Sequence, residues 1–281
     1  MPKKLPKGIR QIAFQEKRDL SRGSGKLCGH ESGTYADKAG SLCRICVLQS
    51  NSRDIEENLA AEEELVQQAE QGVLCLLFWR NEDCVVIGRH QNPEAECHLD
   101  ALKKMGVRIA RRRTGGGAVF QDMGNLNVSF IAPADSLDEQ ICEGILLRAL
   151  EKCGVQARKT GRNDLVIDDV YTNRTEIAGM VKTDGQSGTA VPFEEGGKFS
   201  GSASWQTPGG NLLFHATLMF DVDLDKMKAA LNASPGKLAR HGIASVRARV
   251  SNLKEHYPDL KMKTVIQAII TESAAILSDV K

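Results

Sequence analysis

The sequence lacks a long apolar run, a large net charge and an internal repeat. Its longest apolar stretch, Val73–Trp79, is far shorter than the roughly 20 residues that a membrane-spanning helix needs. The formal net charge is only +1, which argues against bulk electrostatic binding to nucleic acid or to a membrane surface. We therefore expect neither nucleic acid nor membrane among the partners.

The sequence also lacks the cysteine pattern of a secreted, disulfide-stabilised domain. Its eight cysteines are scattered, and several lie in apolar stretches, as is typical of small buried side chains in a reducing compartment. A zinc site formed by Cys28, His30, Cys43 and Cys46 is disfavoured, because Cys46 opens the first predicted strand.

The first 45 residues differ from the rest of the chain. They lack a sustained hydrophobic period, and residues 1–26 contain eight Lys or Arg but only two acidic residues, Glu16 and Asp19. This composition is weakly similar to that of a mitochondrial presequence, and a disordered tail explains it equally well. We predict a flexible N-terminal extension over residues 1–45. The expected location is mitochondrial if the source is eukaryotic and cytoplasmic otherwise.

From residue 46 onward, amphipathic helical segments alternate with pairs of short apolar strands. This pattern predicts one α+β domain over residues 46–260, with a mixed β-sheet flanked by helices. A polar stretch at 168–197 is predicted to be a surface insertion, and residues 261–281 to be a C-terminal helix. The predicted helices cover 54–71, 94–105, 137–153, 224–231 and 261–281.

The most informative motif lies in residues 111–125, where three glycines, Gly115, Gly116 and Gly117, follow a run of arginines. Glycine permits close backbone approach, so this loop can bring N–H groups to an anionic ligand, with an arginine beside it to hold charge. A structural tight turn is the alternative interpretation.

Three further segments contain residues that could bind a ligand or take part in catalysis. Residues 161–166 place Asn163 and Asp164 before a strand, where they either bind Mg²⁺ or form an ordinary strand-entry turn. In residues 197–204, Lys198 lies among small residues and can hold a carboxylate or phosphate, although an isolated lysine in such a loop is usually only solvated. Residues 237–252 are basic and interrupted by Gly242.

In this order and spacing, the four segments resemble the lipoate–protein ligase A family. The resemblance runs from about residue 46 to residue 260 and includes residues 58–63, 79–81 and 85–93. It implies a fold similar to the catalytic domains of biotin ligases and the cores of class II aminoacyl-tRNA synthetases. It also implies that lipoate is activated with ATP and Mg²⁺ to lipoyl-AMP. The lipoyl group then passes to one lysine of an acceptor, either a lipoyl domain of an E2 subunit of 2-oxoacid dehydrogenase complexes or the glycine cleavage H protein.

The resemblance also implies roles for individual residues. Lys198 would be the essential catalytic lysine, and Asp164 would bind the metal and serve as a candidate base. The remaining cofactor-binding residues would be Arg112, Gly115, Gly116, Gly117, Ala118, Val119, Phe120, Asn163 and His215.

Three departures from the family pattern bear on the activity. Gln121 stands where the family commonly has histidine, the 168–197 insertion precedes Lys198, and the family's small C-terminal domain is expected to be absent. The last departure favours an alternative, a lipoyltransferase that uses preformed lipoyl-AMP or needs a separate activating subunit.

Other activities fit the sequence less well. An octanoyltransferase with a catalytic cysteine after the lysine is disfavoured, because every cysteine precedes Lys198. A biotin ligase fits the motifs less well, and a non-catalytic binder of lipoyl domains would not need Lys198, Arg112 and Asp164. Acceptor docking is expected near Arg240, Arg247 and Arg249.

Overall fold

A computed structural model describes residues 4–16, 42–161, 163–168, 197–232 and 250–278. Its centre is an eight-stranded sheet in which only β2 and β3 run parallel and all other neighbours are antiparallel. The strands, in spatial order, are β1 (Ile9–Glu16), β2 (Arg44–Ser50), β3 (Val73–Trp79), β7 (Asn125–Pro133), β11 (Asn211–Met219), β10 (Lys198–Gln206), β9 (Asp164–Ile167) and β8 (Ala157–Thr160).

A second, three-stranded sheet lies beside the large one. It consists of β5 (Arg108–Arg111), β4 (Cys84–Ile87) and β6 (Val119–Gln121), with β4 and β5 parallel and β4 and β6 antiparallel. The predicted α+β fold with a mixed sheet flanked by helices is therefore confirmed. The two-sheet arrangement matters for function, because β5 leads into the glycine-rich loop and β6 leads out of it.

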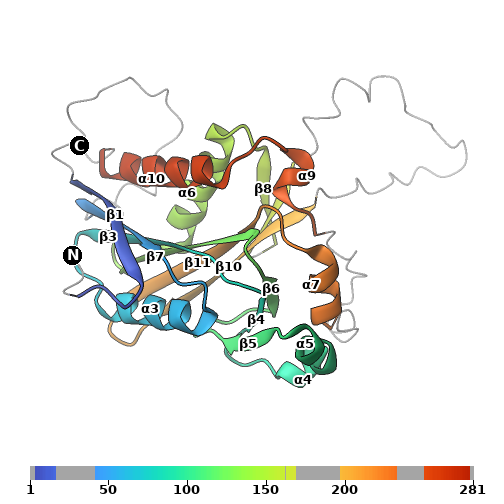
Figure 1. Cartoon of the computed structure of the whole chain (residues 1–281). Helices are drawn as coiled ribbons and strands as arrows, with labels where there is room; N and C mark the ends of the chain where they lie inside the picture. The colour runs from blue at the N-terminus through green and yellow to red at the C-terminus, as the bar shows by residue number, and fades with distance from the viewer. Residues whose placement is uncertain (1–3, 17–41, 162, 169–196, 233–249, 279–281) are drawn as a thin grey trace, which may run out of the picture.

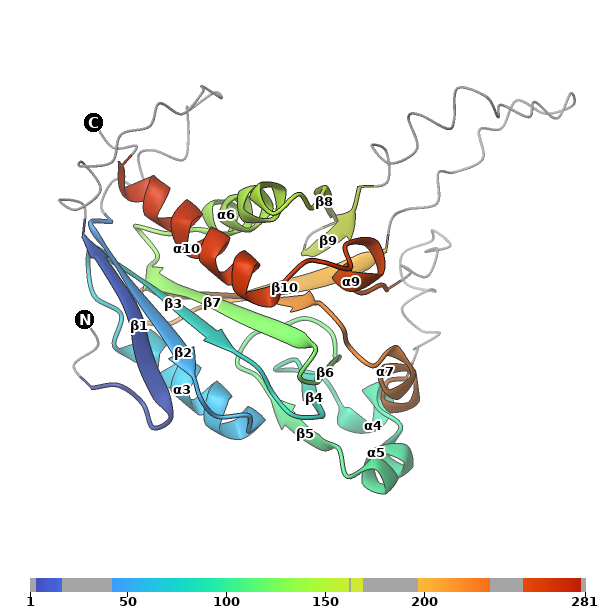
Figure 2. The same ribbon diagram turned by 45° about the horizontal axis from the view of Figure 1, so that its top comes forward.

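Helices cover both faces of the large sheet (Figures 1 and 2). The helices α6 (Glu139–Lys152) and α10 (Met262–Ser278) pack on one face, and α3 (Ile55–Gln67) packs on the other. The small sheet packs against α5 (Leu99–Met105) and α7 (Leu224–Ala230), and two single-turn helices, α4 (Pro93–Glu96) and α9 (Leu253–His256), complete the described elements.

The central strand β7 shows how the sheet combines a core with a site. All nine of its residues are buried, since helices cover both faces. Val128 and Phe130 face α6 and α10, where Phe130 meets Phe214 edge to face at 5.9 Å. Alternate residues point to opposite faces of a strand, so Asn127 and Ser129 lie on the α3 side. These buried polar groups begin the site described below.

The prediction that residues 1–45 form an extension outside the fold is wrong for Ile9–Glu16. These residues form edge strand β1 and pair antiparallel with β2, which itself begins at Arg44 rather than at Cys46. The C-terminal helix is likewise part of the same domain, because Val265, Ile269 and Leu277 of α10 lie in the core with α6. The domain therefore extends beyond the predicted limits of 46 and 260 at both ends.

The single helix predicted over 94–105 is also wrong. It is divided into α4 and α5, and between them Cys97 is extended and forms a bridge with Leu231. Cys97 is buried beside Ala230 and Leu102, so a tertiary contact overrides the local helical pattern. The other predicted helices agree with the structure to within a few residues at each end.

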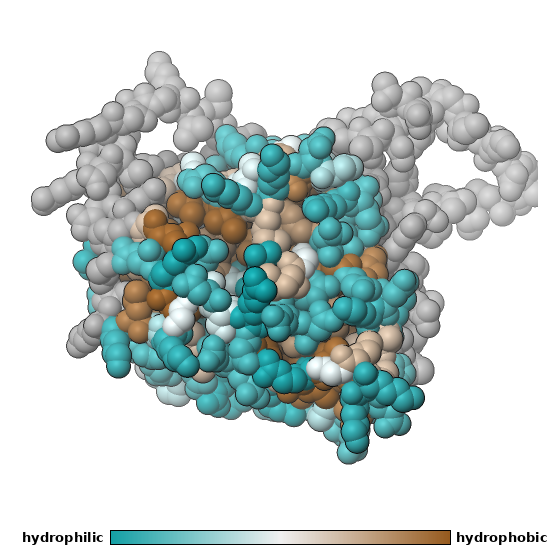
Figure 3. Space-filling view, in the orientation of Figure 1, coloured by the Kyte–Doolittle hydropathy of each residue, from teal (hydrophilic) through white to brown (hydrophobic). Residues whose placement is uncertain are grey.

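Several sequence predictions fall outside the described residues. They concern Cys28 and His30, most of the 168–197 insertion, and Arg240, Arg247 and Arg249. Among the described helices, none combines the length and apolar composition needed to cross a membrane. On the face seen in Figure 3, hydrophobic side chains reach the surface only in small patches between hydrophilic ones.

The start of α3 gives a first testable prediction. The Asp54 carboxylate accepts hydrogen bonds from the backbone N–H groups of Glu56 and Glu57 and pairs with Arg108 at 2.7 Å. The Arg108 guanidinium and these N–H groups hold the pKa of Asp54 below its ordinary value. We expect Asp54→Ala to lower the free energy of unfolding by about 1 kcal/mol, since a helix N-cap is lost.

The pH dependence separates the charge of Asp54 from its capping role. Because the folded-state pKa is depressed, the contribution of the charge is present above the unfolded pKa, near 4, and is lost as the pH falls through the folded value. Asp54→Asn keeps a capping oxygen but lacks the charge, so its stability should fall short of the wild type at pH 7, and the difference should shrink as the pH falls below about 4. Denaturant unfolding at pH 7 and pH 3 measures both effects, and equal stability of all three proteins at pH 7 would contradict the prediction.

Candidate active site

A pocket of about 340 Å³ lies where the glycine-rich loop meets the large sheet. Strands β9, β10 and β11 supply Asp164, Lys198 and His215, and the loop supplies Gly116 and Gly117. The fold thus brings together three sequence motifs that are widely separated along the chain. Of the predicted site residues, all but Gly115 and Phe120 line this pocket.

Lys198 and Asp164 form an ion pair in the pocket. The Lys198 Nζ lies 2.7 Å from Asp164 Oδ1, and the two side chains are 31% and 38% exposed. Asp164 lies opposite Gly201 in the β9–β10 pairing, where a Cβ added to Gly201 would approach both Asp164 Oδ1 and Lys198 Nζ at 3.8 Å. The glycine therefore leaves open space over the pair. Lys198 is a paired, partly buried cation facing a cavity, in contrast to a freely solvated surface lysine.

Arg112 is committed to the glycine-rich loop itself. Its guanidinium donates to the backbone oxygens of Val86, Gly115 and Gly117 and to Thr114 Oγ1, at 2.6–3.1 Å. Burial lowers its pKa to about 10, so it remains charged at neutral pH. Most of its five N–H donors are already used. Arg112 thus shapes the loop and adds positive charge to the pocket wall, while most of its donors are turned away from any ligand.

The loop is held against β4 by close backbone contact. Gly116 has a φ of +91°, which favours glycine, and a Cβ added to Gly88 would lie only 2.3 Å from the Gly116 carbonyl oxygen. These glycines therefore do form a tight turn, as the alternative interpretation of the sequence proposed. The same turn also places Gly116 and Gly117 in the pocket wall, so the structural and ligand-binding interpretations are compatible.

Strand β6 continues the pocket wall and shows why Phe120 differs from its neighbours. Val119 and Gln121 line the pocket, whereas the Phe120 side chain faces the core of the small sheet with Val85 and Leu102. This follows from the alternation of side chains along a strand. Phe120 can therefore offer only its backbone to a ligand in this pocket. The prediction that Phe120 binds a cofactor can hold for its backbone groups but not for its side chain.

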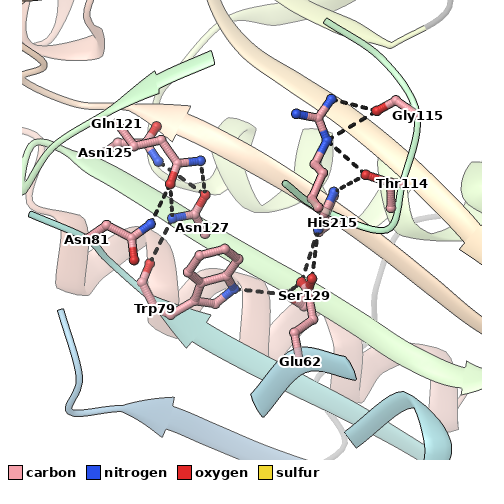
Figure 4. A network of polar contacts seen from close by, with 11 residues as sticks. Glu62, Trp79, Asn81, Thr114, Gly115, Gln121, Asn125, Asn127, Ser129 and His215 are labelled. Atoms are coloured by element: carbon pink, nitrogen blue, oxygen red, sulfur yellow. Dashed lines mark hydrogen bonds and ion pairs between the residues drawn. The ribbon is translucent and has the colours of Figure 1, made fainter. Parts of the chain in front are cut away.

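Gln121, the residue that departs from the family pattern, belongs to a buried network of amides (Figure 4). Its oxygen accepts from Asn81 at 2.6 Å and its nitrogen donates to Asn127 at 2.9 Å. The Asn127 amide in turn donates to the Trp79 carbonyl oxygen at 3.4 Å. These contacts join the small sheet to the large one through neutral groups. Sequence reasoning identified Gln121 but missed Asn81 and Asn127.

A second polar network joins the sheets on the other side of Trp79 (Figure 4). His215 contacts Thr114 through Nε2 at 2.9 Å and the Glu62 carboxylate through Nδ1 at 3.0 Å. Ser129 donates to Glu62 at 2.5 Å and accepts from the Trp79 indole at 2.9 Å. Glu62 and Ser129 were missed because one lies in an acidic helix and the other in an apolar strand, so neither stands out in the sequence.

The pocket has an apolar side formed by Leu59, Trp79 and Val86 and a polar side formed by the Lys198–Asp164 pair. Such a division suits a ligand with a hydrocarbon part and an anionic end. Among the described residues, no group of three or more His, Cys, Asp or Glu is arranged to hold a metal ion. Asp164 is the one carboxylate among the residues that line this pocket.

Comparison with known proteins agrees with this geometry. The family model that describes the lipoyl protein ligase A/B catalytic domain matches residues 54–274 of this chain. The fold is similar to a chain of a bi-partite lipoate protein ligase from Thermoplasma acidophilum, described with its E2 lipoyl domain. That likeness has a TM-score of 0.63 and 29% identity and covers 86% of this chain and 85% of the other. A lipoate-protein ligase A bound with ATP matches with a TM-score of 0.62 and 26% identity, covering 84% and 86% of the two chains.

The matched region spans most of the chain and contains every part of the pocket. The fold and the site thus define a lipoyl ligase catalytic domain. The chain belongs to the lipoyl protein ligase A/B catalytic domain family and is an enzyme of the lipoate–protein ligase group.

Proposed function

We propose that this enzyme activates lipoate with ATP to lipoyl-AMP and transfers the lipoyl group to a lysine of a lipoyl domain. The observation that carries the proposal is the convergence of Lys198, Asp164 and the glycine-rich loop on one pocket with an apolar side. The apolar side would take the acyl chain and the polar side the reacting carboxylate and α-phosphate.

In the first step, a lipoate carboxylate oxygen attacks the α-phosphorus of ATP and pyrophosphate leaves. Both reactants are anions, so the site must offset their repulsion. Lys198 would contact the carboxylate and the α-phosphate, and Asp164 at 2.7 Å holds its ammonium group in place. The N–H groups of the glycine-rich loop, whose shape Arg112 maintains, would donate to phosphate oxygens.

Asp164 is also the residue suited to hold Mg²⁺. Magnesium in nucleotide sites is commonly bound by one or two carboxylates together with substrate phosphates. One oxygen of Asp164 contacts Lys198, and a second carboxylate oxygen remains on the same side chain. The ion would neutralise charge on the phosphates.

In the second step, the acceptor lysine amine attacks the acyl carbonyl of lipoyl-AMP, an amide forms and AMP leaves with the acyl–phosphate bond electrons. The amine must lose a proton, and Asp164 is the carboxylate within the pocket that could accept it. The similar Thermoplasma acidophilum ligase is described with an E2 lipoyl domain, which supports lipoyl domains as the acceptors. We extend the proposal to the glycine cleavage H protein.

A second candidate is a transferase that uses lipoyl-AMP made elsewhere or requires an activating subunit. The observation that favours it is the likeness to a chain of a ligase described as bi-partite. The pocket would then perform only the second step, with the same residues.

One experiment separates the two candidates. The purified chain is mixed with an apo lipoyl domain, with lipoate and Mg-ATP in one tube and synthetic lipoyl-AMP in another, and the acceptor is weighed by intact mass spectrometry. Modification in both tubes supports the complete ligase. Modification with lipoyl-AMP alone supports the transferase, and no modification in either tube contradicts both.

A further inference from the structure

The starting observation is a buried carboxylate that the proposed reaction does not use. Glu62 lies on α3, is 3% exposed, and is absent from the described residues that line the pocket. Its oxygens contact Ser129 Oγ at 2.5 Å and His215 Nδ1 at 3.0 and 3.2 Å. A buried carboxylate is costly to keep charged unless its neighbours donate to it, so these contacts require an explanation.

The hydrogen bonds around Glu62 determine where the His215 hydrogen lies. Ser129 Oγ accepts from the Trp79 indole, so its own hydrogen is free to donate to Glu62. The Glu62 carboxylate can only accept, so His215 Nδ1 must carry a hydrogen to complete its contact. The environment of Glu62 therefore fixes the Nδ1–H form of the ring.

The other side of the ring is consistent with the same assignment. Thr114 Oγ1 accepts from Arg112 Nε at 2.9 Å, which leaves the Thr114 hydrogen to donate to His215 Nε2. With a neutral ring that carries its hydrogen on Nδ1, every donor in this network has an acceptor. With the hydrogen on Nε2, the Nε2–H and the Thr114 hydroxyl hydrogen would compete for one contact, and Nδ1 would face Glu62 without a hydrogen.

The network ends at the loop that borders the pocket. Arg112, whose Nε donates to Thr114, also donates to the carbonyl oxygens of Gly115 and Gly117. Glu62 on α3 is thus connected through His215 and Thr114 to the shape of a loop carried by the other sheet. Burial lowers the pKa of Arg112, and the nearby negative charge of Glu62 acts in the opposite direction and favours the charged guanidinium.

We propose that Glu62 is a positioning residue that fixes the Nδ1–H form of His215 and thereby holds Thr114, Arg112 and the glycine-rich loop in the orientation that binds nucleotide. The proposal deepens the proposed function and rests on it for the activity readout alone. Glu62 acts through His215, without touching substrate.

The decisive variant is Glu62→Gln, which keeps the shape and replaces one acceptor by an N–H₂ donor. The Ser129 hydroxyl donates at the Oε1 position and so retains the amide oxygen there, which places the N–H₂ group at the Oε2 position, 3.2 Å from His215 Nδ1. A donor at that place opposes a hydrogen on Nδ1 and favours the hydrogen on Nε2. Two-bond ¹⁵N–¹H correlation spectra of the ligand-free protein distinguish the two ring forms, and the His215 signals are assigned by their loss in His215→Gln. We expect Nδ1–H in the wild type and Nε2–H in Glu62→Gln.

In Glu62→Gln, the change of the His215 ring form should be accompanied by slower activation of lipoate. We expect the rate of adenylate formation to fall on the order of 10²-fold, because the wrong ring form would break the contact with Thr114 and displace the glycine-rich loop, and a misplacement near 1 Å in a catalytic site costs about that much. Glu64→Gln on the same helix is the matched control. Glu64 is exposed and accepts from Gln68 at 3.1 Å, so its exchange should change neither the ring form nor the rate.

A second pair of variants keeps the test decisive if Glu62→Gln does not fold. Thr114→Val removes the hydroxyl that contacts His215 Nε2, so it should lower the rate of adenylate formation without changing the His215 ring form. Thr114→Ser keeps a hydroxyl and should restore the rate. An unchanged ring form in Glu62→Gln, or full activity of Thr114→Val, would overturn the proposal. A wild type that forms no adenylate would instead contradict the proposed ligase, and the spectra would still test the role of Glu62.

Discussion

Replacement of Lys198 by alanine is expected to abolish lipoyl transfer while the protein remains folded. The substitution removes the ammonium group that pairs with Asp164 at 2.7 Å and leaves that carboxylate facing the incoming anions. Loss of one preorganised charge-stabilising donor costs on the order of 10²–10³-fold in rate, and the added repulsion from Asp164 should increase that loss. Pyrophosphate release measures the first step, and intact mass of an acceptor lipoyl domain measures the second.

The matched control is Lys226→Ala. Lys226 also forms a short ion pair, with Asp83 at 2.6 Å, but it lies on α7 and does not line the pocket. Both variants lose a lysine from a partly exposed pair, so their thermal stabilities should be similar, since such pairs contribute little. If Lys198→Ala transferred lipoyl groups as well as Lys226→Ala, the role assigned to Lys198 would be wrong.

The site residues that could be predicted from the sequence are those that stand together in short segments of unusual composition. Gly116, Gly117 and Lys198 stand in compact motifs with unusual composition, and all three line the pocket. The mixed sheet was also predictable, because strands such as Val73–Trp79 are continuous apolar runs bounded by polar turns.

The contacts that could not be predicted link residues far apart in the chain. Glu62 meets His215 across 153 positions, and nothing near Glu62 distinguishes it from the acidic residues around it on α3. The role of Arg112 was expected to be ligand binding, since a sequence does not show that the nearest acceptors are the carbonyl groups of its own loop. Similarly, the break between α4 and α5 depends on the contact of Cys97 with Leu231.

Strand β1 illustrates a different reason for failure. Ile9–Glu16 is an edge strand in which Arg10 and Ile12 are exposed and a register shift interrupts the pairing between Gln11 and Ala13. Edge strands often carry charge and irregularity, which weakens the alternating pattern used to predict them. The basic residues nearby then favoured the interpretation of a flexible extension.

The close approach of Gly88 to the glycine-rich loop predicts a large effect of one methyl group. In Gly88→Ala the new Cβ would lie 2.3 Å from the Gly116 carbonyl oxygen and 3.2 Å from two backbone carbons of the loop. Backbone cannot rotate away as a side chain can, so the loop must shift and the contacts of Arg112 with Gly115 and Gly117 must lengthen. We expect about 1–3 kcal/mol of lost stability from overpacking.

The effect on function should be larger for the nucleotide than for the acceptor. Because the displaced loop forms the wall of the pocket beside Lys198, the KM for ATP is expected to rise on the order of 10-fold or more, since a misplacement near 1 Å is costly in a catalytic site. Gly209→Ala is the control, because its Cβ would meet only Thr207 Oγ1, at 3.7 Å, in a turn outside the pocket. Thermal unfolding and initial rates at varied ATP and acceptor concentrations measure both effects. Equal KM values for ATP in the two variants would show that the loop tolerates the displacement, and a specific rise in Gly88→Ala would show that β4 holds the loop in the position that nucleotide requires.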